Sequence, residues 1–417
     1  MRTYRELFRT AEFTPLLLAS AGQTAAQTVG GLALGILVFE RTESALLSSL
    51  AMFGPALAQV VGAATVLSGA DRLPPRAALT GLGLLFCAGT AVQAVPGLPV
   101  GAVFAVLLVL GVVGSVGGGV RYGLLNEVLT RDGYLLGRSV LTMSAGVVQI
   151  GGFAVGSALV ALLSARGTLL SAAGLYLLAA AVARLGLSRR PPRHTGRTSV
   201  AGTWRTDALL WSSVPRRYVY LALWVPNGLV VGVESLYVPY APRDAGLLFA
   251  CGAGGMLVGD AVAGRFLPAG WRDRLAVPLC VLLAAPYLFF AFDPGLPLAL
   301  VLVTLATSGY ASGLLLQERL VALTPDELSG QALGLHGAGM LTLQGVGAAA
   351  AGAAAELTSP ATAMAATAAA SLTATLLLAP GLRRSRTPDP TPGRAPDRAP
   401  DRAAAAPGKQ EALPAPE

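Results

Sequence analysis

Residues 98–122 read LPVGAVFAVLLVLGVVGSVGGGVRY, and every side chain from Val100 to Val120 is uncharged. A helix rises 1.5 Å per residue, so about 20 apolar residues are enough to cross the hydrocarbon core of a bilayer. The turn residues Pro96 and Gly97 stand just before the run, where a helix is expected to begin. This stretch is therefore predicted to be a membrane-spanning helix.

The same pattern recurs along the whole chain. Of the 417 residues, 54% are hydrophobic and only 12% are charged, whereas about 25% of the residues of a soluble protein are charged. That is too little charge to cover a soluble domain of this length. The sequence therefore predicts an all-α integral membrane protein with twelve transmembrane helices. These lie near residues 13–39, 44–69, 77–95, 98–122, 138–164, 168–187, 217–241, 245–267, 275–292, 296–317, 331–356 and 360–380.

Basic side chains orient these helices, because Lys and Arg concentrate in the cytoplasmic loops of membrane proteins. If the N-terminus is cytoplasmic, most basic residues ahead of the C-terminal tail fall at cytoplasmic ends, and only Arg41, Arg166 and Arg243 fall outside. Little lysine beside abundant arginine and alanine is typical of a high-GC bacterial genome. We therefore expect a multi-pass protein of a bacterial inner (plasma) membrane with both termini in the cytoplasm.

A weak internal repeat indicates two pseudo-symmetric, six-helix halves. Gly62 corresponds to Gly255, and Arg72 to Arg265, at one constant offset. Paired repeats of six helices are one way to build a site at the membrane midplane that opens to either side. The tail is rich in proline and is predicted to be disordered. The expected divisions are a cytoplasmic N-terminus over 1–12, a first half over 13–187, a cytoplasmic linker over 188–215, a second half over 216–380 and a disordered cytoplasmic tail over 381–417.

The loop after the second predicted span resembles a known motif. Residues 67–76 read LSGADRLPPR, which is similar to the cytoplasmic G-x-L-a-D-R-x-G-R-R motif of the major facilitator superfamily. Asp71, Arg72 and the final Arg76 are kept, while the first glycine is leucine and the later Gly-Arg is Pro-Pro. Residues 126–138 also resemble that family's loop between helices 4 and 5. The resemblance implies a transporter fold with two halves around a central cavity.

The same resemblance implies a cytoplasmic gate. The resemblance implies that Asp71, Arg72 and Arg76 hold the cytoplasmic side of the transporter shut. They would do so by contacting a helix N-terminus or an arginine of the other half. The alternative is that these charges only anchor loops in the cytoplasm. The Gly-Pro motif of the family's drug–proton antiporters has no counterpart in residues 144–163, which contain no proline. Further gate candidates at the inner ends of spans are Arg121, Glu127, Arg265 and Glu318.

Polar side chains within spans are costly and usually face the interior of the bundle. Gln23 and Gln27 are four residues apart and therefore share a helix face. Glutamine offers a donor and an acceptor without a charge, so a cavity lined in this way suits a neutral or amphiphilic solute better than an anion. The alternative is that these residues only bond neighbouring helices. The full set of cavity candidates is Gln23, Gln27, Gln59, Gln149, Gln344, Trp224, Asn227 and Tyr237.

Three ionisable residues are candidates for coupling transport to protons. Glu234 follows Pro226 and Gly228, which can break the helix, and a carboxyl group in a low dielectric can take up and release a proton. Its alternative role is a residue near the outer mouth that is either solvated or paired with Arg243. For Asp260 the sequence favours a cytoplasmic network with the loop that carries Asp71, and coupling is the alternative. His336 can titrate near neutral pH, but a lone histidine in a span also serves as a packing residue.

Several functional classes are not supported by the sequence. The sole lysine, Lys409, lies in the tail, so the chain has no phosphate-binding Walker loop. No clustered motif indicates an enzyme, a metal site, a cofactor or a nucleic-acid partner. We expect a monomer in the lipid bilayer that exports small hydrophobic or amphiphilic molecules by alternating access, with protons as a possible coupling ion. The alternatives are an importer of a neutral nutrient and a non-transporting membrane protein.

Overall fold

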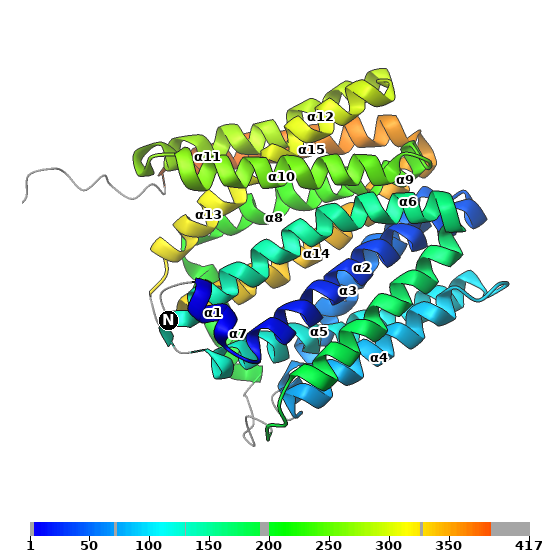
Figure 1. Cartoon of the computed structure of the whole chain (residues 1–417). Helices are drawn as coiled ribbons and strands as arrows, with labels where there is room; N and C mark the ends of the chain where they lie inside the picture. The colour runs from blue at the N-terminus through cyan, green and yellow to red at the C-terminus, as the bar shows by residue number, and fades with distance from the viewer. Residues whose placement is uncertain (1–3, 71–72, 130, 192–199, 326–327, 385–417) are drawn as a thin grey trace, which may run out of the picture.

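The computed structural model describes residues 4–70, 73–129, 131–191, 200–325 and 328–384 (Figure 1). Within these ranges the chain is helical and contains no β-strand. The predicted gate residues Asp71 and Arg72 lie outside the described residues, as do residues 192–199 of the predicted linker and the tail from residue 385 onward.

The first half consists of a short N-terminal helix followed by long membrane helices. The longest element, α6, contains a break at Ser164, whose φ of 73° and ψ of 167° are not helical. The chain reverses its direction at this point (Figure 1), between the spans predicted over 138–164 and 168–187. The bounds are α1 (Tyr4–Arg9), α2 (Phe13–Thr42), α3 (Ala45–Ala70), α4 (Pro75–Gln93), α5 (Val100–Val128) and α6 (Arg131–Gly186).

The predicted number of spans is confirmed. Eleven helical segments of the described chain are long and apolar enough to cross a bilayer. One of them, Leu136–Gly186, has 51 residues, whereas a single span needs about 20. Its division at Ser164 gives two spans and brings the total to twelve.

The second half contains more interruptions than the first. Its first element, α7, forms within the predicted linker, and three of its spans are divided, at Leu236, at Ala285 and at Gly309–Tyr310. The bounds are α7 (Val200–Ser212), α8 (Val214–Ser235), α9 (Tyr237–Tyr240), α10 (Ala245–Phe266), α11 (Ala269–Ala284), η1 (Ala285–Phe292), α12 (Leu296–Ser308), α13 (Ala311–Ala322), α14 (Ser329–Leu357) and α15 (Pro360–Arg384).

Pro226 does not break its helix, although the sequence suggested that it can. Helix α8 continues through Pro226 and ends only at Ser235. A proline removes the hydrogen bond to the carbonyl four residues earlier, but helices inside a membrane tolerate this loss. Ser371 Oγ of α15 donates to the Pro226 carbonyl over 3.2 Å and ties this turn of α8 to α15. The interruption falls ten residues later, at Leu236.

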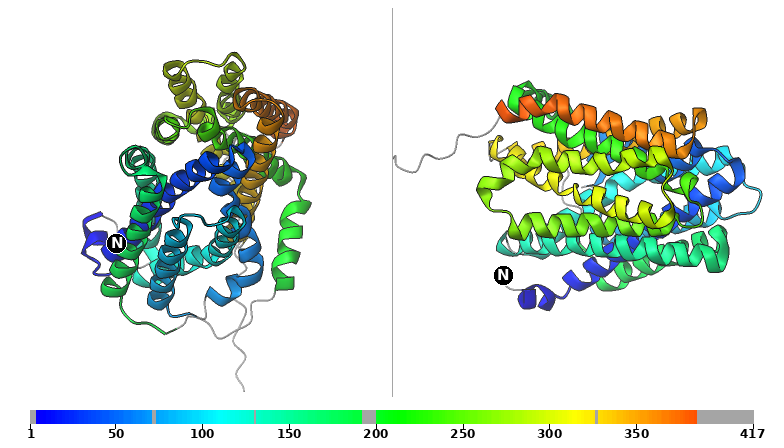
Figure 2. Two further views of the ribbon diagram at one scale, coloured as in Figure 1. Left: turned by 90° about the vertical axis from the view of Figure 1, so that its right-hand side faces the viewer. Right: turned by 90° about the horizontal axis from the view of Figure 1, so that it is seen from above.

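The two halves meet along two helix pairs, α3 with α14 and α6 with α10. Figure 2 shows the first half, coloured blue to green, beside the second half, coloured green to orange. Small residues allow this close approach. A Cβ atom added to Gly352 of α14 would lie 2.7 Å from the Leu46 Cα of α3. The absence of a side chain at Gly352 therefore lets the two backbones touch.

Apolar packing joins the halves at one end of the bundle. The largest core cluster contains Val38 and Ala45 of the first half together with Leu236 and Ala355 of the second. We call this end, where α2 finishes and α10 begins, the joined end. It is the end at the right of Figure 1.

At the opposite end the apolar clusters belong to one half each. One cluster holds Phe13 and Leu187 of the first half, and a separate one holds Val219 and Leu382 of the second. Helix α1 and the last turn of α15 also lie here (Figure 1). We call this the separated end. It carries both ends of the described chain, as an even number of spans requires.

Candidate functional site

A cavity of about 510 Å³ lies mainly within the first half, and α14 of the second half closes one side. Pockets for small molecules usually have volumes of about 300–1,000 Å³. Gly111, Gly114, Gly117 and Gly118 of α5 line the cavity, and Gly118 leaves space open there. A Cβ atom added to Gly118 would meet no atom within 4 Å.

The predicted glutamines come together at this cavity. Gln23 and Gln27 of α2 both line it, as their shared helix face requires, and so do Gln59, Gln149 and Gln344. These side chains reach the cavity from four helices that are far apart in sequence. The lining also includes Gln93, Thr90 and Thr24, which the sequence did not single out, together with apolar residues such as Phe86 and Leu110.

The other three cavity candidates lie elsewhere. Trp224 and Tyr237 are buried in the second half and are not part of the cavity lining. The Trp224 indole N–H donates to the His336 carbonyl over 3.0 Å. Asn227 does not line the cavity but contacts a residue that does: its Oδ1 accepts a hydrogen bond of 2.9 Å from Gln344.

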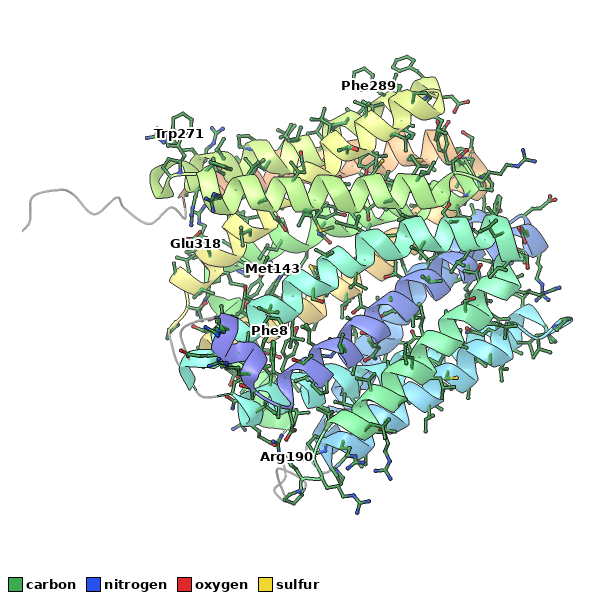
Figure 3. The ribbon with its side chains drawn as sticks, viewed as in Figure 1. Phe8, Met143, Arg190, Trp271, Phe289 and Glu318 are labelled. Atoms are coloured by element: carbon green, nitrogen blue, oxygen red, sulfur yellow. The ribbon has the colours of Figure 1, made fainter. Side chains whose placement is uncertain are left out.

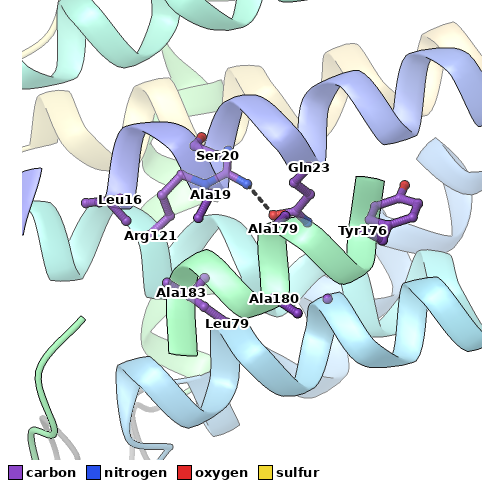
Figure 4. Close-up of a pocket in the computed structure, with 11 residues that line it drawn as sticks. Leu16, Ala19, Ser20, Gln23, Leu79, Arg121, Tyr176, Ala179, Ala180 and Ala183 are labelled. Carbon is purple, nitrogen blue, oxygen red and sulfur yellow. Dashed lines mark hydrogen bonds between the residues drawn. The ribbon is translucent and has the colours of Figure 1, made fainter. Parts of the chain in front are cut away.

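Arg121 lines the cavity and does not lie at the end of its helix, where it was predicted from the sequence. Helix α5 continues to Val128, so Arg121 lies about 10 Å inside the helix end at 1.5 Å per residue. Its Nη2 donates to Gln23 Oε1 over 2.9 Å (Figure 4). Among the described residues, no carboxylate lies within 4.0 Å of its guanidinium. A charge at this depth in an apolar run is itself a sign of function.

Glu234 belongs to a cluster of tyrosines in the second half. The Tyr310 hydroxyl donates to Glu234 Oε1 over 3.0 Å, and Tyr310 stands in the break between α12 and α13. Tyr237 and Tyr287 are hydrogen-bonded to each other through their hydroxyls nearby. No ion pair to Arg243 or to any other basic residue of the described chain is formed, so the alternative role as an ion-paired surface residue is not adopted here.

The three coupling candidates do not form one cluster. His336 is bonded through its carbonyl to Trp224, which lies ten residues before Glu234 on α8, or about 15 Å along the helix. The His336 side chain is buried, and its Nδ1 has no hydrogen-bond partner. Asp260 is exposed on α10.

Two gate candidates, Glu127 and Glu318, lie in ion pairs, and neither pair crosses to the other half. Arg190 bonds Glu12 over 3.0 Å and lies 3.9 Å from Glu127, so this group joins the first half to the segments that flank it. Arg272 bonds Glu318 over 3.0 Å, both in the second half. Figure 3 shows Arg190 and Glu318 at the separated end, on different halves. Arg265 is exposed near the end of α10, and Arg76 lies in the first turn of α4.

Comparison with known proteins identifies the architecture. No protein-family model matches the sequence, and no curated protein matches it. Solved structures do match. A POT family transporter in complex with a thioalcohol-conjugated peptide aligns with a TM-score of 0.71 at 10% identity, over 90% of this chain and 96% of that one. The nucleoside transporter NupG aligns with a TM-score of 0.71 at 13% identity, over 88% and 99%. The chain has the major facilitator fold.

A third match has a described conformation. A bacterial homologue of the human lysosomal transporter Spinster, in an inward-facing and unoccupied state, aligns with a TM-score of 0.63 at 14% identity, over 91% of this chain and 96% of that one. Because the sequence identities are only 10–14%, these structural matches establish the fold of the chain and nothing about its substrate. The motif in residues 67–76 therefore predicted the major facilitator fold correctly, while no subgroup follows.

In this major facilitator fold, polar contacts cross between the halves at the joined end. Glu356 of α14 accepts hydrogen bonds from Ser44 Oγ over 2.6 Å and from the Leu46 N–H over 3.1 Å. Ser44 and Leu46 stand at the start of α3, so the carboxylate caps this helix from the other half. Ser49 Oγ also donates to the Ser235 carbonyl over 3.2 Å. The sequence analysis missed Glu356.

Proposed function

We propose that the protein is a secondary active transporter that exports small amphiphilic molecules by alternating access. The main support is a cavity of about 510 Å³ in a two-half fold that is packed together at one end only. A wall that contains glutamines together with Phe86, Leu110 and Phe53 suits a solute with a polar and an apolar part. The five predicted glutamines are proposed to contact that solute.

The separated end is proposed to face the cytoplasm of a bacterial cell, with both termini. Arg189, Arg190, Arg272 and Arg384 lie at this end, and basic residues concentrate on the cytoplasmic side. The structure then corresponds to an inward-facing state, and the joined end is the closed outer gate. Asp71, Arg72, Arg76 and Glu318 are proposed to help to close the inner side when the halves rock.

A plugged cavity tests the transport proposal. Gly118→Phe places an aromatic ring in the cavity without a clash at Cβ, and Gly174→Phe is the matched control, since Gly174 is equally free of neighbours but lies outside the cavity lining. Both variants are expressed with the wild type in a bacterial strain that lacks its main efflux pumps. We expect wild type and Gly174→Phe to lower the accumulation of amphiphilic fluorescent dyes and Gly118→Phe not to. Equal accumulation with and without the wild-type protein would contradict export.

Import is the second candidate, because the matching solved structures include peptide and nucleoside transporters. Proteoliposomes distinguish the two directions. Protease cleavage of a tag on the C-terminal tail determines the orientation of the protein in the liposome membrane. Radiolabelled peptide, nucleoside or amphiphile is then supplied on one side of the membrane at a time. Import driven by an inward proton gradient, without any outward movement of amphiphiles, would replace the export proposal.

Proton coupling is proposed to use Glu234. Its carboxylate has a hydrogen bond from Tyr310 and no ion pair within the described chain. A carboxylate without a cationic partner can be neutralised without leaving an unpaired buried cation behind. We expect Glu234→Gln to abolish the dependence of transport on an imposed pH gradient and to leave solute exchange at equal pH intact. Asp260→Asn and His336→Gln serve as comparisons, and a wild-type protein that ignores the gradient would refute coupling.

A further inference from the structure

The cavity has a net positive charge. Of the side chains that line it in the described structure, Arg121 alone is charged, and the other polar ones are glutamines, threonines and Tyr176. The lining contains no aspartate, glutamate or histidine from the described residues. A solute in this cavity therefore meets a cation that the protein itself does not neutralise there.

Arg121 has unused hydrogen-bonding capacity. A guanidinium carries five N–H donors, and one hydrogen bond, to Gln23 Oε1 over 2.9 Å, is formed by this side chain. A buried charge is costly unless it is paired and hydrogen-bonded. The side chain comes from α5 and reaches α2 in a narrow part of the cavity between Leu79, Ala180 and Ala183 (Figure 4). Arg121 also lines the cavity of about 510 Å³, so its remaining donors can reach a group bound there.

The neighbours of Arg121 add further donors and no carboxylate. Gln23 accepts through Oε1, which leaves its Nε2 amide as a donor towards the cavity. The Tyr176 ring stacks on Phe86 with the centroids 5.2 Å apart, and Tyr176 lines the same part of the cavity as Arg121 and Gln23. Arg121 of α5 and Gln23 of α2 thus bring a guanidinium and an amide together, while the Tyr176 ring lies beyond Gln23 (Figure 4).

We propose that Arg121 binds an anionic group of the transported solute, a carboxylate, phosphate or sulfonate, with Gln23 as an additional donor. The planar guanidinium matches these groups through paired hydrogen bonds. The apolar part of the solute lies along Phe86 and Leu110. This inference rests on the proposed transport function and narrows its substrate class from neutral or amphiphilic solutes to amphiphilic anions.

Binding to the full-length protein in zwitterionic nanodiscs tests the assignment. The probes share one octyl chain and differ in the head group: octanoate, octyl phosphate and octanesulfonate against octanamide and octylamine. We expect the anions to bind the wild type at least about tenfold more tightly than the amide and the amine, and more weakly as salt is added. Inorganic phosphate and added phosphatidylglycerol are tested as competitors, because a free anion or a lipid head group offers the same chemistry.

Variants connect the effect to Arg121. Arg121→Gln is expected to lose at least about tenfold in affinity for the anions while keeping its affinity for octanamide, and Arg121→Lys is expected to recover part of the loss. Arg274→Gln removes the same charge at an exposed position of α11 outside the cavity and should bind like the wild type. Tighter competition by inorganic phosphate or by phosphatidylglycerol than by any octyl anion would overturn the assignment to a solute.

Equal affinity for octanamide and octanoate, no binding of any anion, or unchanged anion binding by Arg121→Gln would likewise overturn it. None of these results affects the proposed function, which the Gly118→Phe and Gly174→Phe comparison measures separately. If both of those variants and the wild type fail to move any dye while octanoate still binds through Arg121, the anion site stands and the transport proposal fails.

Discussion

The two ends of the bundle are held together in different ways. At the joined end, Glu356 and Ser235 of the second half accept hydrogen bonds from Ser44 and Ser49 of the first. At the separated end, the ion pairs of Arg190 and Arg272 do not cross to the other half. The links between the halves described here consist of apolar packing at the joined end, a helix cap, a few hydrogen bonds and close glycine contacts. Such links can open without disturbing the interior of either half.

The largest expected effect at the joined end comes from Gly352→Ala. An added Cβ would lie 2.7 Å from the Leu46 backbone, and overpacking of this kind costs about 1–3 kcal/mol. Gly337→Ala on the same helix is the matched control, since no atom lies within 4 Å of its added Cβ and alanine favours a helix by about 1 kcal/mol over glycine. Thermal unfolding in detergent should show a lower Tm for Gly352→Ala and an unchanged or higher one for Gly337→Ala. Equal Tm values for the two variants would mean that the close contact between α3 and α14 at Gly352 does not contribute to thermal stability.

A smaller effect is expected from loss of the cap. Glu356→Ala removes the acceptor for Ser44 Oγ and the Leu46 N–H, and Glu356 is exposed. We expect a cost of a few tenths to about 1 kcal/mol at the joined end, measured as faster thiol labelling of a cysteine placed at Ala45. A double-mutant cycle that combines Glu356→Ala with Ser44→Ala measures the interaction between these two side chains, because the effects of interacting residues are not additive. Strictly additive effects would show that the two side chains are not coupled.

The smallest effect is expected at the separated end. Arg272→Gln breaks the ion pair with Glu318, which is half-exposed and therefore worth at most about 1 kcal/mol. Because both partners belong to the second half, thiol labelling at the joined end should not change. A change there as large as that of Glu356→Ala would show that the pair takes part in the gate in this state.

Features determined by local sequence were predicted well. The span count followed from the lengths of apolar runs, and the break at Ser164 fell between two runs that were each long enough to cross a bilayer. Gln23 and Gln27 came to one cavity because a four-residue spacing fixes their common face. These predictions required no knowledge of which helices are neighbours.

Features that depend on helix neighbours were not predicted. Glu356 caps a helix whose start is 312 residues away, and no periodicity in the sequence reveals such a partner. Trp224 of α8 and Tyr237 of α9 are buried within the second half, and no residue of either helix lines the cavity, because the packing of the helices sets these side chains against their own half. Arg121 was placed at a helix end because the span was predicted to end near residue 122, whereas α5 extends to Val128.

The distance between spin labels at each end tests the account most directly. Cys87, Cys251 and Cys280 are replaced by alanine, and one label pair is placed at each end, at positions exposed in the structure. The joined-end pair is Val95→Cys with Leu357→Cys, and the separated-end pair is Leu185→Cys with Trp271→Cys. We expect conditions that shorten the separated-end distance, such as added octanoate or a change of pH, to lengthen the joined-end distance. Two distances that stay fixed, or that change in the same direction, would contradict alternating access by rocking halves.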